Sequence, residues 1–199
     1  MLKIDSKKVL LESLMELLQT RSIEDITVQQ IVDHCGASRS TFYRHFTDKY
    51  NLMIWPYQAE LDRLIDKPPT RSTYKPVMDE ALSFLKTQKR YFSKIAKVES
   101  QNSFGGFMYS RALHYMVGYL KNALECDELP LEYRLSAQAS SAGYAFLILE
   151  WLKRGCDVPI DELSWILANS IPANIAVFFL PPTDDEAKNE DTQGRVLPS

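Results

Sequence analysis

Apolar residues recur every three or four positions along most of this chain, which is the spacing of one face of an α-helix. The pattern predicts helices at about 5–20, 27–35, 39–45, 47–66, 75–89, 90–99, 104–125, 131–154 and 160–179. No segment alternates apolar and polar residues as a half-buried strand does. Glycine is rare, with 7 in 199 residues, while 45% of the residues are hydrophobic. We therefore expect an all-α globular protein.

The second and third predicted helices are bounded by strong local signals. Thr27 is a good N-cap, and Gln30 three residues later completes a capping box. Gly36 suits the left-handed conformation that ends a helix, and Ser38 can cap the next one. Two short helices joined by a tight glycine turn predict a helix-turn-helix, whose second helix enters the major groove of DNA.

The outer face of the helix at 39–45 carries side chains suited to DNA. Phe42 and Phe46, four residues apart, mark its inner face. Arginine forms bidentate contacts with guanine, whereas hydroxyl and ammonium groups suit phosphates. The expected groove contacts are Arg39, Ser40, Tyr43 and Arg44. The other expected DNA-binding residues are Ser38 and, toward phosphates, Thr27, Thr41, His45 and Lys49. The alternative is an ordinary solvated amphipathic helix, but the combination of caps, glycine turn and outer face favours DNA.

The stretch from Thr27 to Lys49 also resembles a known family. It follows the pattern T-V-x-x-I-V-x-x-C-G-A-S-R-S-T-F-Y-R-H-F-x-D-K. This pattern is similar to the DNA-binding domain of the tetracycline-repressor (TetR) family, and its most specific part is F-Y-x-H-F followed by D-K. Three positions depart from the family: Cys35 where alanine is usual, Ala37 where valine is common, and Ser40 where glycine is frequent.

The resemblance implies a transcriptional regulator, a repressor, that binds a double-stranded, palindromic DNA operator as a homodimer and responds to a small-molecule effector. We expect an N-terminal three-helix helix-turn-helix domain at 1–50 and a helical effector-binding and dimerisation domain at 51–180. A loop at 67–72 is the expected junction, and Pro56 is expected to kink the preceding helix. Residues 181–199 are acidic and poor in apolar residues, so they are expected to form a disordered tail.

Charge limits how such a protein can bind DNA. The net charge is −3, and residues 1–50 hold seven basic and seven acidic residues. Surface charges are screened within about 10 Å, so phosphate attraction must come from local clusters. We therefore expect specific binding to depend on a two-fold dimer, which presents its recognition helices about 34–36 Å apart.

Other kinds of chemistry find little support in the sequence. There is no nucleophile elbow, zinc motif or dinucleotide fingerprint, and the three histidines lack metal-ligand spacing. The three cysteines also lack such spacing, and no signal peptide is evident. We expect no enzyme activity, no cofactor, no metal and a cytoplasmic protein with reduced thiols. The uncharged stretch 163–183 has polar residues in its middle, which favours a buried interface helix over a membrane span.

An aromatic-rich segment at 91–119 is the expected effector site. Ligand pockets are mostly apolar and aromatic with a few polar groups, and the family resemblance favours an effector site for the group. The expected pocket residues are Tyr91, Phe92, Phe107, Tyr109, His114, Tyr115, Tyr119 and Tyr144. For each residue taken singly, ordinary core packing is the alternative.

The segment 142–152 (AGYAFLILEWL) is apolar nearly all round, so it must be covered on more than one side. A partner subunit is a natural second cover, and a four-helix dimer interface is also what the resemblance implies. The expected interface residues are Phe146, Leu149, Trp151, Leu167, Ile171 and Phe178. The run from Glu150 to Leu163 is also similar to a subgroup related to regulators of dihydroxyacetone kinase genes. The alternative function is a co-regulator that binds a protein partner in place of a small molecule.

Overall fold

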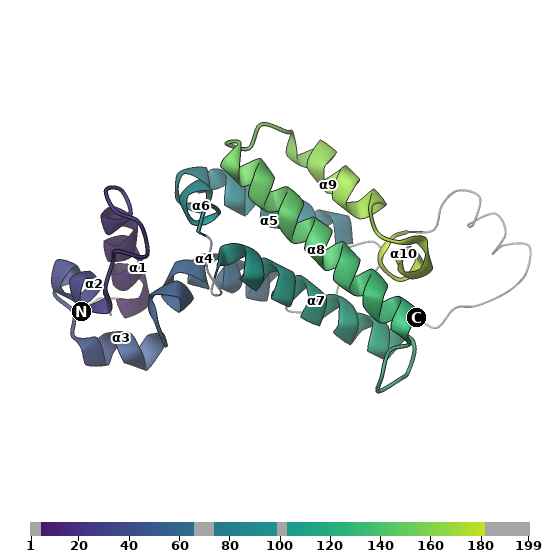
Figure 1. Ribbon diagram of the computed structural model, residues 1–199, viewed down its shortest axis with the longest axis horizontal. Helices are drawn as coiled ribbons and strands as arrows, with labels where there is room; N and C mark the ends of the chain where they lie inside the picture. The colour runs from purple at the N-terminus through teal and green to yellow at the C-terminus, as the bar shows by residue number, and fades with distance from the viewer. Residues whose placement is uncertain (1–4, 66–73, 99–102, 182–199) are drawn as a thin grey trace, which may run out of the picture.

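The computed structural model describes residues 5–65, 74–98 and 103–181, and these residues form ten α-helices and no strand (Figure 1). The helices are α1 (Ser6–Leu17), α2 (Val28–Cys35), α3 (Arg39–His45), α4 (Lys49–Leu64), α5 (Tyr74–Thr87), α6 (Lys89–Ile95), α7 (Phe104–Ala123), α8 (Leu131–Lys153), α9 (Ile160–Asn169) and α10 (Ala173–Phe179). The all-α prediction is confirmed. Figure 1 shows a small head of α1, α2 and α3, and a larger body that α4 joins to it.

Three short helices pack around a shared apolar centre in the head. Leu10 and Leu14 of α1, Ile31 of α2 and Phe42 of α3 are fully buried. Burial of one such side chain contributes about 1.5–3 kcal/mol. The Ser13 hydroxyl of α1 donates to the Ile31 carbonyl oxygen at 2.7 Å, inside the same core. These contacts fix how α2 and α3 lie on α1.

The predicted caps of the helix-turn-helix are confirmed. The Thr27 hydroxyl accepts from the Gln30 N–H at 3.2 Å, and the Gln30 side-chain oxygen accepts from the Thr27 N–H at 2.9 Å. Gly36 ends α2 with a φ of 69°, in the left-handed region that favours glycine. The Ser38 hydroxyl accepts from the Thr41 N–H at 3.0 Å and begins α3. The turn between α2 and α3 is therefore specified by nearby residues alone.

Helix α4 belongs to both the head and the body. In its first turns, the Trp55 ring meets the Phe46 ring edge-on, with centroids 5.8 Å apart. Half a turn further on, Tyr57 is fully buried in the core of the body. The division expected at residue 50 therefore falls inside this helix. The junction loop expected at 67–72 lies outside the described residues, as does the expected tail beyond residue 181.

The turn of α4 around Pro56 receives a hydrogen bond from the body. Proline has no N–H, so the Leu52 carbonyl oxygen lacks its usual partner four residues on. The Tyr91 hydroxyl of α6 donates to the next carbonyl oxygen, that of Met53, at 2.6 Å. A body helix is thus anchored to the interrupted turn of α4. The expected kink at Pro56 stays a prediction.

Helices α7 and α8 lie side by side along the body (Figure 1). Gly105 permits their close approach, because a Cβ atom at that position would lie 2.5 Å from Leu149 Cδ1. Helix α5 packs against α4 and α9, while α6 and α10 pack against α8. This arrangement surrounds α8 with other helices on several sides.

The single helix expected at 160–179 is in fact two helices. Helix α9 ends at Asn169, and α10 begins at Ala173 after Pro172. Proline lacks an N–H and disfavours the helical conformation in the residue before it, so the chain turns at this point. None of the described helices is long and apolar enough to cross a bilayer. The same residues bring together no group of three potential metal ligands.

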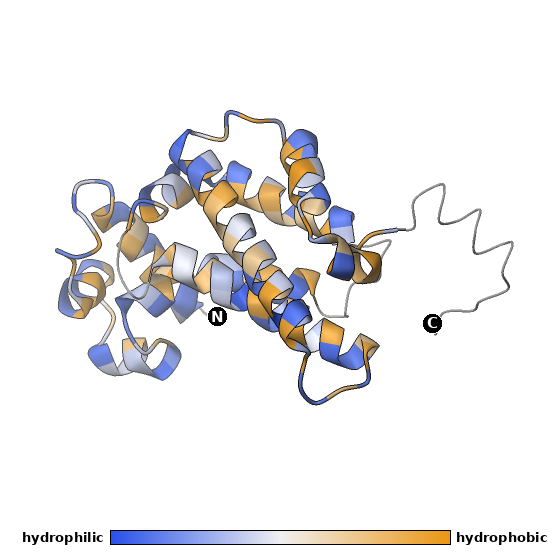
Figure 2. Ribbon diagram, turned by 45° about the vertical axis from the view of Figure 1, so that its right-hand side comes forward, coloured by the Kyte–Doolittle hydropathy of each residue, from blue (hydrophilic) through white to orange (hydrophobic). Residues whose placement is uncertain are grey.

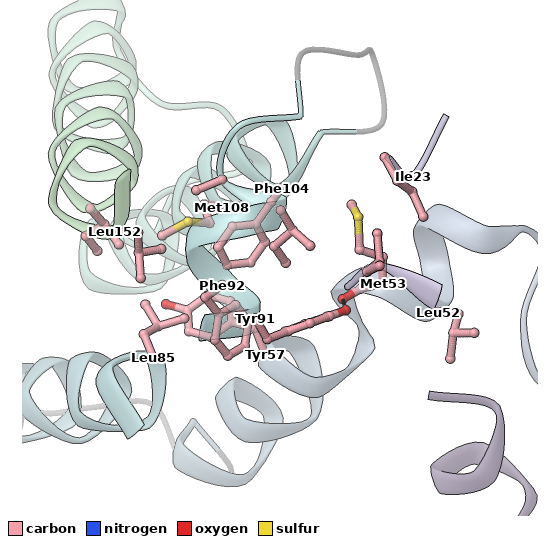
Figure 3. Close-up of a cluster of buried hydrophobic side chains, with 14 of the residues drawn as sticks. Ile23, Leu52, Met53, Tyr57, Leu85, Tyr91, Phe92, Phe104, Met108 and Leu152 are labelled. Atoms are coloured by element: carbon pink, nitrogen blue, oxygen red, sulfur yellow. Dashed lines mark hydrogen bonds between the residues drawn. The ribbon is translucent and has the colours of Figure 1, made fainter. Parts of the chain in front are cut away.

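Most buried side chains belong to one core that runs from the head into the body, and its aromatic centre lies where α4, α6 and α7 meet. Figure 3 shows Tyr57 and Tyr91 gathered with Phe92, Phe104 and Met108 in this core. The Phe104 ring lies 5.5 Å from the Phe92 ring and 5.4 Å from the Tyr57 ring, measured between centroids. A second, smaller cluster joins α7, α8 and α10 and contains Met116, Leu120, Ala137, Ile175 and Phe179.

Candidate nucleic-acid interface

The side chains predicted for the DNA groove lie on the exposed face of α3. The four residues are Arg39, Ser40, Tyr43 and Arg44, and each is exposed. Tyr43 keeps 51% of its surface in solvent, whereas Phe42 beside it is fully buried in the head. Helix α3 is therefore held by its apolar face and presents a polar face outward.

Two contacts orient Tyr43 on this face. Its ring meets the Phe42 ring edge-on, with centroids 5.4 Å apart. The Arg39 guanidinium lies 6.0 Å from the centre of the Tyr43 ring, at the outer limit of a cation–π contact. Within the described residues, neither Arg39 nor Arg44 forms a salt bridge. Both guanidinium groups are thus available for DNA.

Two of the other predicted DNA-binding residues also serve as caps. Thr27 caps α2 and Ser38 caps α3, and the Ser38 and Thr41 hydroxyl oxygens lie 2.9 Å apart. His45 is half-buried at the opposite end of α3, with its ring centroid 6.3 Å from that of Phe46. The contacts of Thr27, Thr41 and His45 with phosphate stay a prediction.

Lys49 makes two hydrogen bonds within the head that the sequence pattern did not indicate. Its ammonium group donates to the carbonyl oxygens of Glu24 at 2.9 Å and Ile26 at 2.8 Å. These carbonyls belong to the loop between α1 and α2, just before the Thr27 cap. Lys49 therefore ties the start of α4 to this loop with two of its three N–H groups, and its predicted phosphate contact stays a prediction.

Two small cavities adjoin each other in the body, among α5, α7 and α8. The first has a volume of about 80 Å³ and is also lined by α4, and the second has a volume of about 100 Å³ and is also lined by α9. Four residues line both cavities: Tyr74, Ala112, Tyr115 and Tyr144. Two of the eight predicted pocket residues, Tyr115 and Tyr144, are therefore at these cavities.

The other six predicted pocket residues line neither of these two cavities, and a role in effector binding stays a prediction for them. In the main core or packed against it are Tyr91, Phe92, Phe107 and Tyr109. Tyr119 packs against Phe179 in the second cluster, with ring centroids 5.0 Å apart. His114 is exposed. Helical spacing brings aromatic residues to the interior but does not separate packed positions from positions that border a cavity.

Tyr57 and Tyr74 line the first cavity, and the sequence pattern did not indicate either. The Tyr57 and Tyr144 hydroxyl oxygens lie 3.1 Å apart and form a hydrogen bond between α4 and α8. Burial raises the pKa of Tyr57 to about 12, although the hydrogen bond to Tyr144 lowers it in part. Burial also raises the pKa of Tyr144. Both hydroxyls are therefore protonated at neutral pH.

The predicted dimer residues divide between the surface and the protomer's own core. Phe146 of α8 is 63% exposed, as an interface residue of a free protomer should be. Trp151 is only 3% exposed, and its Nε1–H donates to the Val158 carbonyl oxygen at 2.9 Å, so its assignment to the dimer surface is wrong. Leu167 and Ile171 are also buried within the protomer, which corrects their assignment.

The last two predicted dimer residues are half-buried. Leu149 packs over Gly105, and the Phe178 ring meets the Tyr133 ring edge-on at a centroid separation of 6.3 Å. Apolar residues are distributed along much of α8 (Figure 2). Exposed large apolar side chains that the sequence pattern did not single out are Leu131, Leu135, Trp165, Ile166 and Val177.

Comparison with known families covers both the head and the body. The family model described as "Bacterial regulatory proteins, tetR family" matches residues 10–54, from α1 to the first turns of α4. The model described as "Transcriptional regulator C-terminal region" matches residues 72–172, which is half of the chain. No curated protein sequence matches the chain.

Several solved structures share the fold. The dihydroxyacetone kinase operon activator DhaS superposes with a TM-score of 0.59 at 19% identity, over 89% of this chain and 99% of its own. A TetR-family regulator from Streptomyces coelicolor gives 0.55 at 19% identity, over 89% of this chain and 84% of that one. A TetR-family regulator from Syntrophomonas wolfei gives 0.57 at 12% identity, over 90% and 98%. The chain belongs to the TetR family of DNA-binding transcriptional regulators.

Proposed function

We propose that this protein is a repressor that binds a palindromic operator as a homodimer and leaves it when a small molecule occupies the body. The observation that carries the proposal is the outer face of α3, where Arg39 and Arg44 flank Tyr43 on a helix held by buried Phe42. An exposed arginine on a recognition helix can donate two hydrogen bonds to guanine O6 and N7. Because that operator is chromosomal DNA, the protein acts in the cytoplasm.

Exposed apolar residues on α8, α9 and α10 support the homodimer. Phe146 of α8 and Trp165 of α9 expose 63% and 60% of their surface, and Ile166 and Val177 are also exposed. Large apolar side chains that gather on the surface mark association sites. A second copy packed on these helices by two-fold symmetry presents two α3 helices to two inverted half-sites.

The two cavities favour a small molecule over a protein partner as the effector. They lie between helices and are small, so a small molecule fits where a protein surface does not. Tyr57 lines the first cavity from α4, the helix that also packs on the head through Trp55. An occupant therefore contacts an element common to both parts. It lowers operator affinity if it binds more tightly to the conformation in which the heads do not fit the operator.

The proposal is tested by letting the purified protein select fragments from its own genome. The expected result is one enriched motif with two inverted half-sites, about 10 base pairs apart between centres or a multiple of that. Arg44→Ala should lose the preference at one position of each half-site. The matched control is Arg154→Ala, because Arg154 is an exposed arginine of the body. Fragments without an enriched motif, or an unchanged motif with Arg44→Ala, would contradict the proposal.

A further inference from the structure

Two hydroxyl groups in the body are buried without a hydrogen-bond partner in the described part of the chain. They are the Tyr115 hydroxyl of α7 and the Ser140 hydroxyl of α8. Tyr115 lines both cavities, and Ser140 lines the second. Buried hydroxyls are almost always hydrogen-bonded, because an unpaired one has lost its water without compensation. The two unpaired groups at adjoining cavities therefore point to an occupant with a polar group.

The size of the cavities limits that occupant to about one ring. Their volumes are about 80 Å³ and about 100 Å³. An apolar cavity of about 150 Å³ is sufficient for benzene. Either cavity alone is smaller than this, but they adjoin at Tyr115 and Tyr144. A single-ring molecule that spans the boundary fits, whereas a fused polycyclic one does not.

The charge of the lining favours a neutral occupant. Arg111 is the one charged side chain among the described residues that line the two cavities, and its guanidinium pairs with the Asp62 carboxylate. Burial raises the pKa of Tyr115 and of Tyr144, so both hydroxyls keep their protons. A carboxylate or ammonium ligand would lose its hydration on entering the cavities. The lining offers no unpaired opposite charge to compensate for that loss.

The chemistry of the lining favours an aromatic ring over an aliphatic one. Tyr57, Tyr74, Tyr115 and Tyr144 all line the first cavity. Aromatic rings attract each other in edge-to-face and offset geometries beyond the burial of their area. The remaining lining includes aliphatic and thioether side chains such as Leu61 and Met108, which also pack well on a ring face.

We infer that the effector is a small neutral phenol, with its ring across the boundary between the two cavities and its hydroxyl in the second cavity, hydrogen-bonded to Tyr115 and Ser140. The inference rests on the proposed function and gives its effector a chemical class. The ring then lies against Tyr57, whose hydroxyl bonds to Tyr144 at 3.1 Å. Binding is reversible and changes no covalent bond.

Calorimetry with the full-length protein tests the chemical class directly. Phenol and p-cresol should bind saturably. Toluene has the ring without the hydroxyl, cyclohexanol has the hydroxyl without the aromatic ring, and benzoate carries a charge. Each of these three should bind at least about tenfold more weakly; for toluene this corresponds to the loss of one hydrogen bond. Benzoate binding as tight as that of phenol, or no binding of either phenol, would overturn the inference.

Two variants test the position of the hydroxyl. Tyr115→Phe and Ser140→Ala each remove an unpaired buried group, so the free protein should fold at least as stably as the parent. Each should weaken phenol binding about tenfold and leave toluene binding unchanged. The matched controls are Tyr119→Phe and Ser136→Ala, one helical turn away on α7 and α8 and outside both cavity linings. Phenol binding that both cavity variants retain in full would place the ligand elsewhere.

Operator binding by the ligand-free protein separates the inference from the proposed function. If the free protein selects no DNA, the proposed function fails whatever phenol does. If it binds its operator and phenol neither binds nor weakens that complex, only the assignment of the effector fails. Release of the operator by phenol in the parent, and not in Tyr115→Phe at the same concentration, supports both.

Discussion

Replacing Lys49 with methionine separates a structural contact from a phosphate contact. The Lys49 ammonium group donates to the Ile26 carbonyl oxygen in a part-buried setting and to the Glu24 carbonyl oxygen in an exposed one. Methionine keeps the length of the stem but has no donor. The exposed carbonyl regains water at little cost, whereas the part-buried one loses a charged hydrogen bond. The expected loss in the free energy of unfolding is about 1.5–3 kcal/mol.

Two measurements distinguish the alternatives. In urea or thermal unfolding, Lys49→Met should lower the melting temperature by about 2–4 °C for each kcal/mol, given the length of the chain. In DNA binding, the slope of log affinity against log salt should stay the same, because a lost phosphate contact would reduce it by about 0.9. Lys8→Met, at an exposed position of α1, is the control that should not change stability. Unchanged stability with a reduced salt slope would refute the structural reading of Lys49.

Three further predictions concern other parts of the fold. Trp165→Lys should give monomers in sedimentation because a charge replaces an exposed apolar ring. Glu162→Lys on the same helix should leave the dimer intact. A dimeric Trp165→Lys protein would exclude this face of α9 as the interface. Gly36→Ala should lower the free energy of unfolding by about 1–2 kcal/mol, because Gly36 has a φ of 69°. Gly118→Ala inside α7 is the control. A Cβ atom there meets nothing within 4 Å, so this change should not lower the free energy of unfolding. Between pH 10 and about 12, native Tyr57 keeps a proton that the unfolded chain loses, so the free energy of unfolding should fall as the pH rises. Tyr57→Phe should remove up to about 1.4 kcal/mol per pH unit of that decline. If the free energy of unfolding of Tyr57→Phe falls with pH as steeply as that of the parent, this prediction is wrong.

The head could be predicted from the sequence because its signals are local. Thr27, Gly36 and Ser38 each specify a hydrogen bond or a backbone angle within three residues of their own position. Lys49 could not be placed in this way. Its carbonyl partners lie 23 and 25 residues earlier in the chain, and only the folded head brings them together.

The body resisted prediction because its helices are apolar on several faces. Phe146 and Trp151 are both large aromatic residues in one apolar run, about 140° apart around α8. One is exposed and the other is buried with its N–H bonded to a loop carbonyl. The choice between these faces depends on which helices pack against α8, and hydrophobic spacing does not contain that information.

The shared helix α4 decides how far this head can be exchanged with that of another regulator. A chimera cut at residue 50 would leave Trp55 with the body, although its ring meets Phe46 and lies 5.6 Å from the Lys7 ammonium of α1. A cut after Tyr57 would instead remove a fully buried ring from the body. The portable unit therefore ends between Trp55 and Tyr57, at Pro56. Donor and recipient need to match across that one turn for the graft to remain both folded and responsive.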